Sequence, residues 1–165
     1  MRLLVATVVI ALLYPFQQNK LWKGSSGSIS FTSNAPLELI EAESNQLSGV
    51  IKPSENTFAF LILTKSFKGF NSPLQQEHFH ENYMESEKYP KATFSGKFIE
   101  SIKDLKEGDH ELRAKGMLHI HGVSVERIIK CKVEIGKKEI TITSDFKVPL
   151  EDHKISIPQV VYQKI

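Results

Sequence analysis

The sequence contains one cysteine, Cys131, among its 165 residues. A domain with a single thiol cannot be held by internal disulfides, so its stability must come from an apolar core. Charge of one dominant sign is missing as well, because 21 basic and 19 acidic residues are interspersed along the chain and leave a net charge of +2. Without a basic stripe to follow a phosphate backbone, the chain is not expected to bind nucleic acid.

The sequence also lacks an apolar run long enough to cross a bilayer as a helix. The run from Leu3 to Leu13 comes nearest; it follows Arg2 and ends at Tyr14-Pro15. A basic start, a short apolar segment and a helix-breaking boundary are typical of a secretory signal peptide. No pair of small residues marks a cleavage site before Gln17, and a retained membrane anchor is the alternative.

The remaining length fits one well-buried domain and is too short for two ordinary ones. We therefore expect a signal peptide at residues 1–18 and a single domain at residues 24–165, with no stable membrane span in the mature protein. The expected location of such a protein is periplasmic or secreted.

From Gly27 onward, short runs rich in Phe, Ile, Val and Thr alternate in polarity and are separated by clusters of Gly, Asn, Asp and Ser. This pattern predicts strands joined by turns. A turn signal at Asn45 interrupts the second run, and signals at residues 106–109 and 136–138 join neighbours closely enough for antiparallel pairing. We predict eight strands, at residues 28–34, 39–52, 57–67, 92–102, 108–122, 124–136, 138–148 and 156–165.

One stretch has the features of a helix instead. Ser72 is a capping residue, Pro73 suits the first helical position, and Gln75 follows three residues after the cap. These residues predict a helix over about residues 73–86. Phe79 and Tyr83, four residues apart, then share the face that should pack on the sheet.

The third predicted strand is apolar on both faces. Such a strand fits between a barrel interior and a covering element, whereas a half-solvated sheet would have one polar face. The other strands do have one polar face: Phe94 and Phe98, for example, alternate with Ser95 and Lys97. Eight antiparallel strands with apolar faces predict closure into a barrel, which at that size can hold one small ligand. The predicted fold class is all-β, an eight-stranded antiparallel barrel with one covering α-helix.

Two histidine pairs raise the question of a metal site. His78 and His80 lie in the predicted helix, where residues two apart point about 200 degrees away from each other, so this pair cannot bind one ion. His78 does share a face with Glu81 and Glu85. We interpret that face as a solvated surface opposite the one that packs on the sheet.

The second pair, His119 and His121, lies on a strand, where residues two apart point the same way and can bind zinc or iron together. Glu126 follows at a spacing that partly resembles the cupin metal motif. Alternation, however, places both histidines on the polar face with Arg113 and Lys115. We interpret them as structural residues at the barrel rim; a metal-dependent enzyme that uses His119, His121 and Glu126 is the alternative.

Nucleophilic catalysis finds no support in the sequence. No G-x-S-x-G motif is present. Cys131 is in phase with Ile129 and Val133, which favours a buried apolar role over a reactive thiol. We therefore predict no catalytic residues and no cofactor, and we expect that the protein is not an enzyme.

Five segments together resemble the YceI-like domain family of lipocalin-like barrels. They cover nearly the whole expected domain in the family's order. The segments are GSISF at residues 27–31, SGVIK at 48–52, the stretch from Ser66-Phe67 to Ala92-Thr93-Phe94-Ser95-Gly96, GMLHIHGVS at 116–124 and FKVPLEDHKISIP at 146–158. One departure is His119, which stands where the family's L-T-x-H-G motif has threonine.

The resemblance implies an exported barrel whose apolar interior takes a long-chain isoprenoid or a similar lipid, with no catalytic residues. On this reading the ligand lies in the lumen of the barrel. The protein then has a carrier, storage or stress-related role. The lumen residues proposed to contact it are Phe58, Phe60, Ile62, Phe94, Phe98, Leu118, Ile120 and Phe146.

Other interpretations stay open at this point. The interior of a small barrel can be filled completely by side chains, which would leave an exported structural or partner-binding domain without ligand. Phe58, Phe60 and Ile62 could also face the covering helix instead of the lumen, because both faces of their strand are apolar. The sequence does not name the lipid, and a homodimer is left open.

Overall fold

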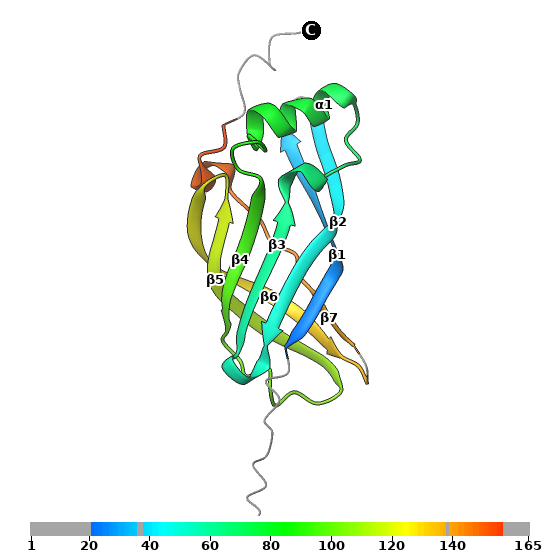
Figure 1. Cartoon of the computed structure of the whole chain (residues 1–165), viewed down its shortest axis with the longest axis vertical. Coiled ribbons are helices and arrows are strands. Elements are labelled where there is room, and N and C mark those ends of the chain that lie inside the picture. The colour runs from blue at the N-terminus through cyan, green and yellow to red at the C-terminus, as the bar shows by residue number, and fades with distance from the viewer. Residues whose placement is uncertain (1–20, 36–37, 138, 157–165) are drawn as a thin grey trace, which may run out of the picture.

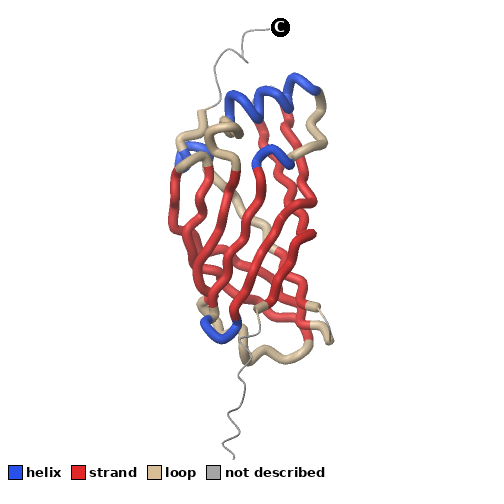
Figure 2. Tube along the Cα trace, viewed as in Figure 1, coloured by secondary structure: helices blue, strands red, loops and turns tan. Residues whose placement is uncertain are grey.

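The computed structural model describes residues 21–35, 38–137 and 139–156. Seven strands form one antiparallel sheet in which each strand pairs with its neighbours in the chain. The sheet curls into a half-barrel, with a helix across one end (Figures 1 and 2). The strands are β1 (Trp22–Ala35), β2 (Glu38–Lys52), β3 (Thr57–Leu63), β4 (Lys91–Phe98), β5 (Gly108–Ile120), β6 (Val123–Ile135) and β7 (Ile140–Thr143).

This architecture confirms the predicted antiparallel barrel type with one covering helix. Seven of the predicted strands correspond to β1–β7. The predicted eighth strand, at residues 156–165, lies outside the described residues except for Ser156. Three of the seven end earlier than expected, since β3 ends at Leu63, β4 at Phe98 and β7 at Thr143, rather than near residues 67, 102 and 148.

The predicted turn at Asn45 is wrong. β2 runs through this position as one strand of 15 residues. Its register against β1 shifts here, from Gly27 opposite Leu47 to Ile29 opposite Ser44, so that β2 carries one extra residue. The polar sequence at Asn45 is thus accommodated by a β-bulge, which bends the strand without ending it.

Alternation along β3 settles which of its faces is inside. Phe58 and Ile62 are buried, whereas Ala59 and Leu63 are exposed. The interior contains two apolar clusters. The helix-end cluster comprises Ile40, Ala42, Ile62, Phe67, Phe79, Tyr83, Met84 and Ile155, and the far-end cluster Ile51, Phe58, Phe98, Ile102, Leu112, Ala114, Cys131 and Val133. β3 therefore connects both clusters along the inside of the sheet.

The covering helix consists of α1 (Pro73–His78) and a π-helical turn, η3 (Phe79–Tyr83). Its predicted cap is confirmed, since the Gln75 backbone N–H donates to Ser72 Oγ at 3.1 Å. Both Phe79 and Tyr83 are buried against the sheet, as expected. Among the described residues, no helix is both long enough and apolar enough to span a membrane.

Short 3₁₀ turns complete the ends of the half-barrel. η1 (Pro53–Glu55) joins β2 to β3, and η2 (Thr64–Ser66) follows β3. η4 (Leu150–His153) packs near β6 at the end covered by the helix (Figure 1). Figure 2 shows η2 and η4 at the end covered by the helix, whereas η1 lies at the opposite end of the sheet.

Candidate functional site

The apolar interior contains seven of the eight residues that the sequence analysis placed in the lumen. Four are buried, and three are partly buried and pack against the two clusters. The buried residues are Phe58, Ile62, Phe98 and Leu118; the partly buried ones are Phe60, Phe94 and Ile120. Phe146 differs, because it follows β7 and is 41% exposed. Contact of these residues with a ligand stays a prediction.

Sheet register arranges the interior residues in rows across β3, β4 and β5. Phe60 lies opposite Phe94, which lies opposite Leu118. The ring of Phe58 contacts those of Phe94 and Phe98, with centroids 4.9 Å and 5.0 Å away. The middle of the interior wall is therefore a continuous aromatic and aliphatic surface, without a polar group in these rows.

A second group of rings lies under the covering helix. Phe79 stacks on Phe31 at 5.3 Å between centroids and meets Phe70 and Phe67 at 5.0 Å and 5.8 Å. Sequence reasoning did not include Phe31, Phe67 or Phe70 among the lumen residues. Alternation in the first predicted strand could have identified Phe31. Phe67 ended the predicted third strand, but β3 ends at Leu63, so Phe67 and Phe70 lie beyond it, where strand alternation does not apply.

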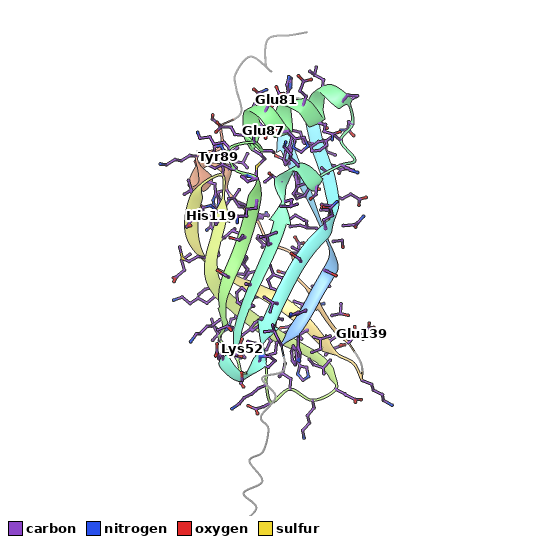
Figure 3. All side chains as sticks on the ribbon, in the orientation of Figure 1. Lys52, Glu81, Glu87, Tyr89, His119 and Glu139 are labelled. Atoms are coloured by element: carbon purple, nitrogen blue, oxygen red, sulfur yellow. The ribbon has the colours of Figure 1, made fainter. Side chains whose placement is uncertain are left out.

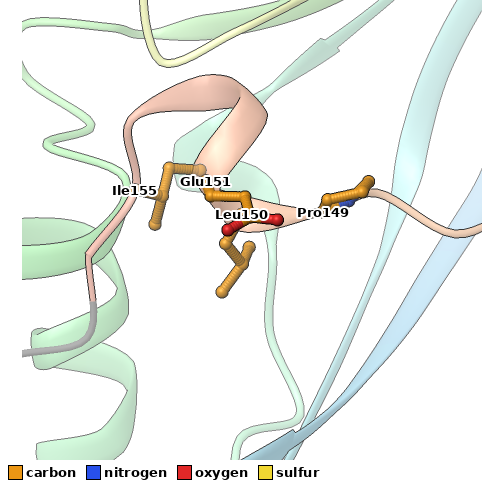
Figure 4. A pocket seen from close by; sticks show the side chains of 4 residues that line it. All are labelled: Pro149, Leu150, Glu151 and Ile155. Carbon is orange, nitrogen blue, oxygen red and sulfur yellow. The ribbon is translucent and has the colours of Figure 1, made fainter.

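An open pocket borders this helix-end cluster. It has a volume of about 380 Å³ and is lined by Pro149, Leu150, Glu151 and Ile155 (Figure 4). Ile155 belongs to the helix-end cluster, and Leu150 packs against it. A further pocket of about 630 Å³ lies beside β5 and β6 and is mostly polar in its side chains, with Arg113 and Lys130 among them. The first pocket thus borders the helix-end cluster, whereas the second borders the far-end cluster through Leu112 and Cys131.

The histidines of the second pair have different partners. His119 Nδ1 lies 2.9 Å from Ser124 Oγ, and Figure 3 shows His119 on β5 at some distance below the helix. His121 Nε2 lies 2.7 Å from Glu85 Oε2, and Glu126 pairs with Lys115 at 3.4 Å. The three candidate ligands of the metal alternative therefore do not meet, and within the described ranges no three His, Cys, Asp or Glu residues could hold a metal ion together.

His121 corrects the expectation that both histidines share the outer polar face. β5 ends at Ile120, and His121 has a φ of +50° in the turn that follows, so strand alternation no longer applies. Its side chain is only 10% exposed and packs edge-on to Tyr89, with ring centroids 4.5 Å apart. The structural role at the rim that we inferred for this residue fits these contacts.

Glu85 corrects a second expectation, since it is not on a solvated helix face. It lies beyond η3 with a φ of +43°. The hydrogen bond from His121 is the main cause that lowers the pKa of its carboxyl, and the charge of Lys88 contributes. The other ring nitrogen of His121 lies 3.1 Å from the His153 carbonyl oxygen. Both nitrogens thus face acceptors, and both hydrogen bonds form together when the ring carries both protons.

Arg127 is an inward-facing residue that sequence reasoning missed. In β6, Ile129, Cys131 and Val133 are buried, and Arg127 alternates in phase with them. Its guanidinium pairs with Asp152 of η4, and its Nε is buried without a hydrogen-bond partner among the described residues. The phase of Ile129 and Cys131, already visible in the sequence, was the signal that could have placed it inside.

An antiparallel sheet curled around an apolar interior and covered at one end defines the class of small β-barrels, which hold side chains or one small ligand inside. The chain belongs to the YceI-like domain family, whose model matches residues 23–165. None of the curated proteins matches the sequence.

Solved structures with this fold have low sequence identity to the chain. A polyisoprenoid-binding domain of Saccharophagus degradans, implicated in plant cell wall breakdown, has a TM-score of 0.68 at 16% identity, over 82% of this chain and 80% of that one. BcnA of Burkholderia cenocepacia gives 0.52 at 11%, over 83% and 74%. The YCEI protein of Campylobacter jejuni gives 0.51 at 16%, over 99% and 91%. These likenesses establish the fold.

Proposed function

We propose that the protein binds a long-chain isoprenoid or a similar amphiphile in the apolar interior of the half-barrel, outside the cytoplasm, as a carrier or store. The observation that carries this proposal is the uninterrupted apolar surface of the rows that contain Phe60, Phe94 and Leu118. The fold shared with the polyisoprenoid-binding domain of Saccharophagus degradans supports the choice of ligand. The proposed export rests on the signal-like residues 1–18, which lie outside the described residues.

Burial of an apolar chain supplies the driving force. Each methylene removed from water contributes roughly 0.8 kcal/mol, so ten buried carbons give about 8 kcal/mol before the costs of association are subtracted. Micromolar affinity requires that the interior be formed in advance. Phe79 and Tyr83 pack the covering helix against the end of the sheet, which supports a preformed interior.

Entry of the chain is proposed at the η4 pocket. Leu150 and Ile155 line this pocket and also contact the helix-end cluster, so a chain end placed there would reach apolar side chains at once. The path then continues along the inner face of β3, from Ile62 to Phe60 and Phe58.

The proposal is tested by titration with isoprenoid alcohols of increasing length, from five to twenty carbons. Trp22, the chain's single tryptophan, packs against the far-end cluster, so its fluorescence reports a ligand in that half of the interior. Because five buried carbons contribute roughly 4 kcal/mol before ordering costs, we expect affinity to rise by at least about tenfold per added five-carbon unit until the interior is full. Absence of binding at every length would contradict the proposed function.

A further inference from the structure

We propose that protonation of His121 controls how fast the ligand exchanges with the apolar interior. The doubly protonated ring holds η4 in place and slows exchange, and the neutral ring releases η4. This inference rests on the proposed function and adds regulation by pH to it. The evidence is the rim contact, in which the imidazole of His121 lies between the carboxylate of Glu85 and the backbone carbonyl of His153.

The rim contact joins a nearly buried ring to acceptors on two different elements. Nε2 of His121 lies 2.7 Å from Oε2 of Glu85, in the segment after η3, and Nδ1 lies 3.1 Å from the carbonyl oxygen of His153 in η4. The side chain of His121 is 10% exposed, and the ring of Tyr89 packs edge-on against it. Tyr89 and the two acceptors thus hold the imidazole in one orientation.

The two acceptors differ in strength, and this difference decides what the loss of a proton does. An imidazole donates from both nitrogens only when it is doubly protonated, and the neutral ring has a single N–H. A carboxylate is a stronger acceptor than a backbone carbonyl, so the remaining proton stays on Nε2, toward Glu85. Nδ1 then presents a lone pair to the carbonyl oxygen of His153. Deprotonation of His121 therefore replaces an attraction to η4 by a repulsion.

Histidine is the side chain whose charge ordinarily changes between pH 5 and 8. The other charged and titratable groups around the ring are Glu85, Lys88 and Tyr89 from the segment after η3, and the ring of His153 from η4. The hydrogen bond from His121 is the main cause that lowers the pKa of the Glu85 carboxyl, which keeps it charged in this range. Lysine and tyrosine ordinarily keep their charge state there as well. The ring of His153 faces a backbone carbonyl of β6, and the substitutions below separate its effect from that of His121.

η4 connects the rim contact to the proposed entry of the ligand. Leu150 begins η4 and Ile155 follows it, and both line the pocket and contact the helix-end cluster. Two further contacts hold η4 to β6, the ion pair of Asp152 with Arg127 and the approach of His153 Nδ1 to a β6 carbonyl at 3.2 Å. Loss of the rim contact therefore loosens η4 without detaching it, and the rate of exchange changes while the fold persists.

The test measures release of geranylgeraniol from the whole protein into an excess of phosphatidylcholine vesicles, followed by the fluorescence of Trp22. Neither the alcohol nor this lipid head group changes charge between pH 5.5 and 8, so a difference in rate comes from the protein. We expect wild type to release the alcohol at least about tenfold faster at pH 8 than at pH 5.5, the factor expected for one hydrogen bond from a charged donor.

Two substitutions should remove this pH response in opposite directions. His121→Phe keeps a ring against Tyr89 but has no N–H, so its release should be fast at both pH values. In Glu85→Gln the new amide can donate to Nε2 of the neutral imidazole, which leaves the ring proton on Nδ1, toward the carbonyl of His153. Release by this variant should be slow at both pH values. A rim contact with a purely structural role would instead make both variants release faster.

His119→Phe is the matched control, because His119 contacts Ser124 on the outer face of the sheet and should not affect η4. It should keep the pH response of wild type. A second readout needs no ligand: NMR relaxation dispersion of the amides of residues 150–155 should show more exchange at pH 8 than at pH 5.5 in the free protein.

Each contrary result has a separate meaning. Equal release rates of wild type at both pH values would overturn this inference and leave the proposed function standing. Failure of geranylgeraniol to bind at either pH would overturn the proposed function, and relaxation dispersion that does not change with pH would then overturn the release of η4 as well. A pH response that persists in His121→Phe would assign it to another group, such as His153, and overturn the role of His121. If His121→Phe does not fold, Glu85→Gln decides: a wild-type pH response in that variant would overturn the inference.

Discussion

At the scale of single residues, Gly96 and Gly116 allow β4 and β5 to approach each other closely. They lie directly opposite each other on β4 and β5. A Cβ built on Gly116 would overlap the carbonyl of Ser95 and lie 3.1 Å from the Cα of Gly96. The two backbones are therefore closer than any side chain at these positions would allow.

We predict that Gly116→Ala destabilises the fold by about 1–3 kcal/mol, because the added methyl group meets backbone atoms that cannot move separately. The measurement is urea unfolding. Gly24→Ala is the matched control, since a Cβ at Gly24 meets nothing within 4 Å. A control change within about 0.5 kcal/mol is expected. Equal effects of the two substitutions would show that the close approach of β4 and β5 is not a constraint.

At the scale of elements, the contact between Glu85 and His121 joins the segment after the covering helix to the turn between β5 and β6. Both residues have positive φ angles, which non-glycine residues rarely adopt. His121 also contacts the carbonyl of His153 in η4. Three elements of the helix-covered rim thus meet at one imidazole ring.

This contact predicts a pH dependence of stability. The pKa of Glu85 is lowered in the folded protein, so its stabilising effect is present above the ordinary glutamate value of about 4.3 and is lost as the pH falls through the folded value. We expect the melting temperature of wild type to exceed that of Glu85→Gln by a constant amount at pH 5 to 6, and the two to converge below pH 4.

Glu81→Gln provides the control for that experiment. Glu81 lies in η3 and is exposed, and it forms no ion pair within the described part of the chain. Its substitution should leave the melting temperature close to that of wild type throughout. A constant difference between wild type and Glu85→Gln down to pH 3 would contradict the assignment of a charged contact to His121.

Sequence patterns predicted those parts of the molecule that depend on local periodicity. Alternation placed Phe58 and Leu118 correctly on apolar strand faces, and the Ser72 cap located the start of the helix. His121 was misplaced because a turn with positive φ follows β5, and alternation carries no information there. The exposure of Phe146 was likewise not predictable, since it depends on β7 ending at Thr143.

At the scale of the whole molecule, the central question is whether the interior holds a ligand or is filled by its own side chains. The two apolar clusters are joined along β3, and the helix covers one end of the path (Figure 1). Leu118 lies at mid-height of this interior, opposite Phe94 and Val125. A large side chain at that position would occupy the space that the ligand is proposed to use.

We predict that Leu118→Trp abolishes binding of a twenty-carbon isoprenol in calorimetric titrations while the melting temperature stays within a few degrees of wild type. Leu63→Trp, on the outer face of β3 and 46% exposed, is the control and should bind as wild type does. A filled interior would behave differently, because the indole would find no space and would cost about 1–3 kcal/mol of stability. Unchanged binding by a folded Leu118→Trp variant would show that Leu118 does not line the space that the ligand occupies.

The most direct test of the account is native mass spectrometry of the protein purified gently from its own cells, followed by organic extraction of the same sample. The account predicts a mass above that of the polypeptide by one lipid, which the extract then identifies as a long-chain isoprenoid or a similar amphiphile. A protein at the mass of the bare polypeptide, with no lipid in the extract and none taken up when geranylgeranyl phosphate is offered, would contradict it.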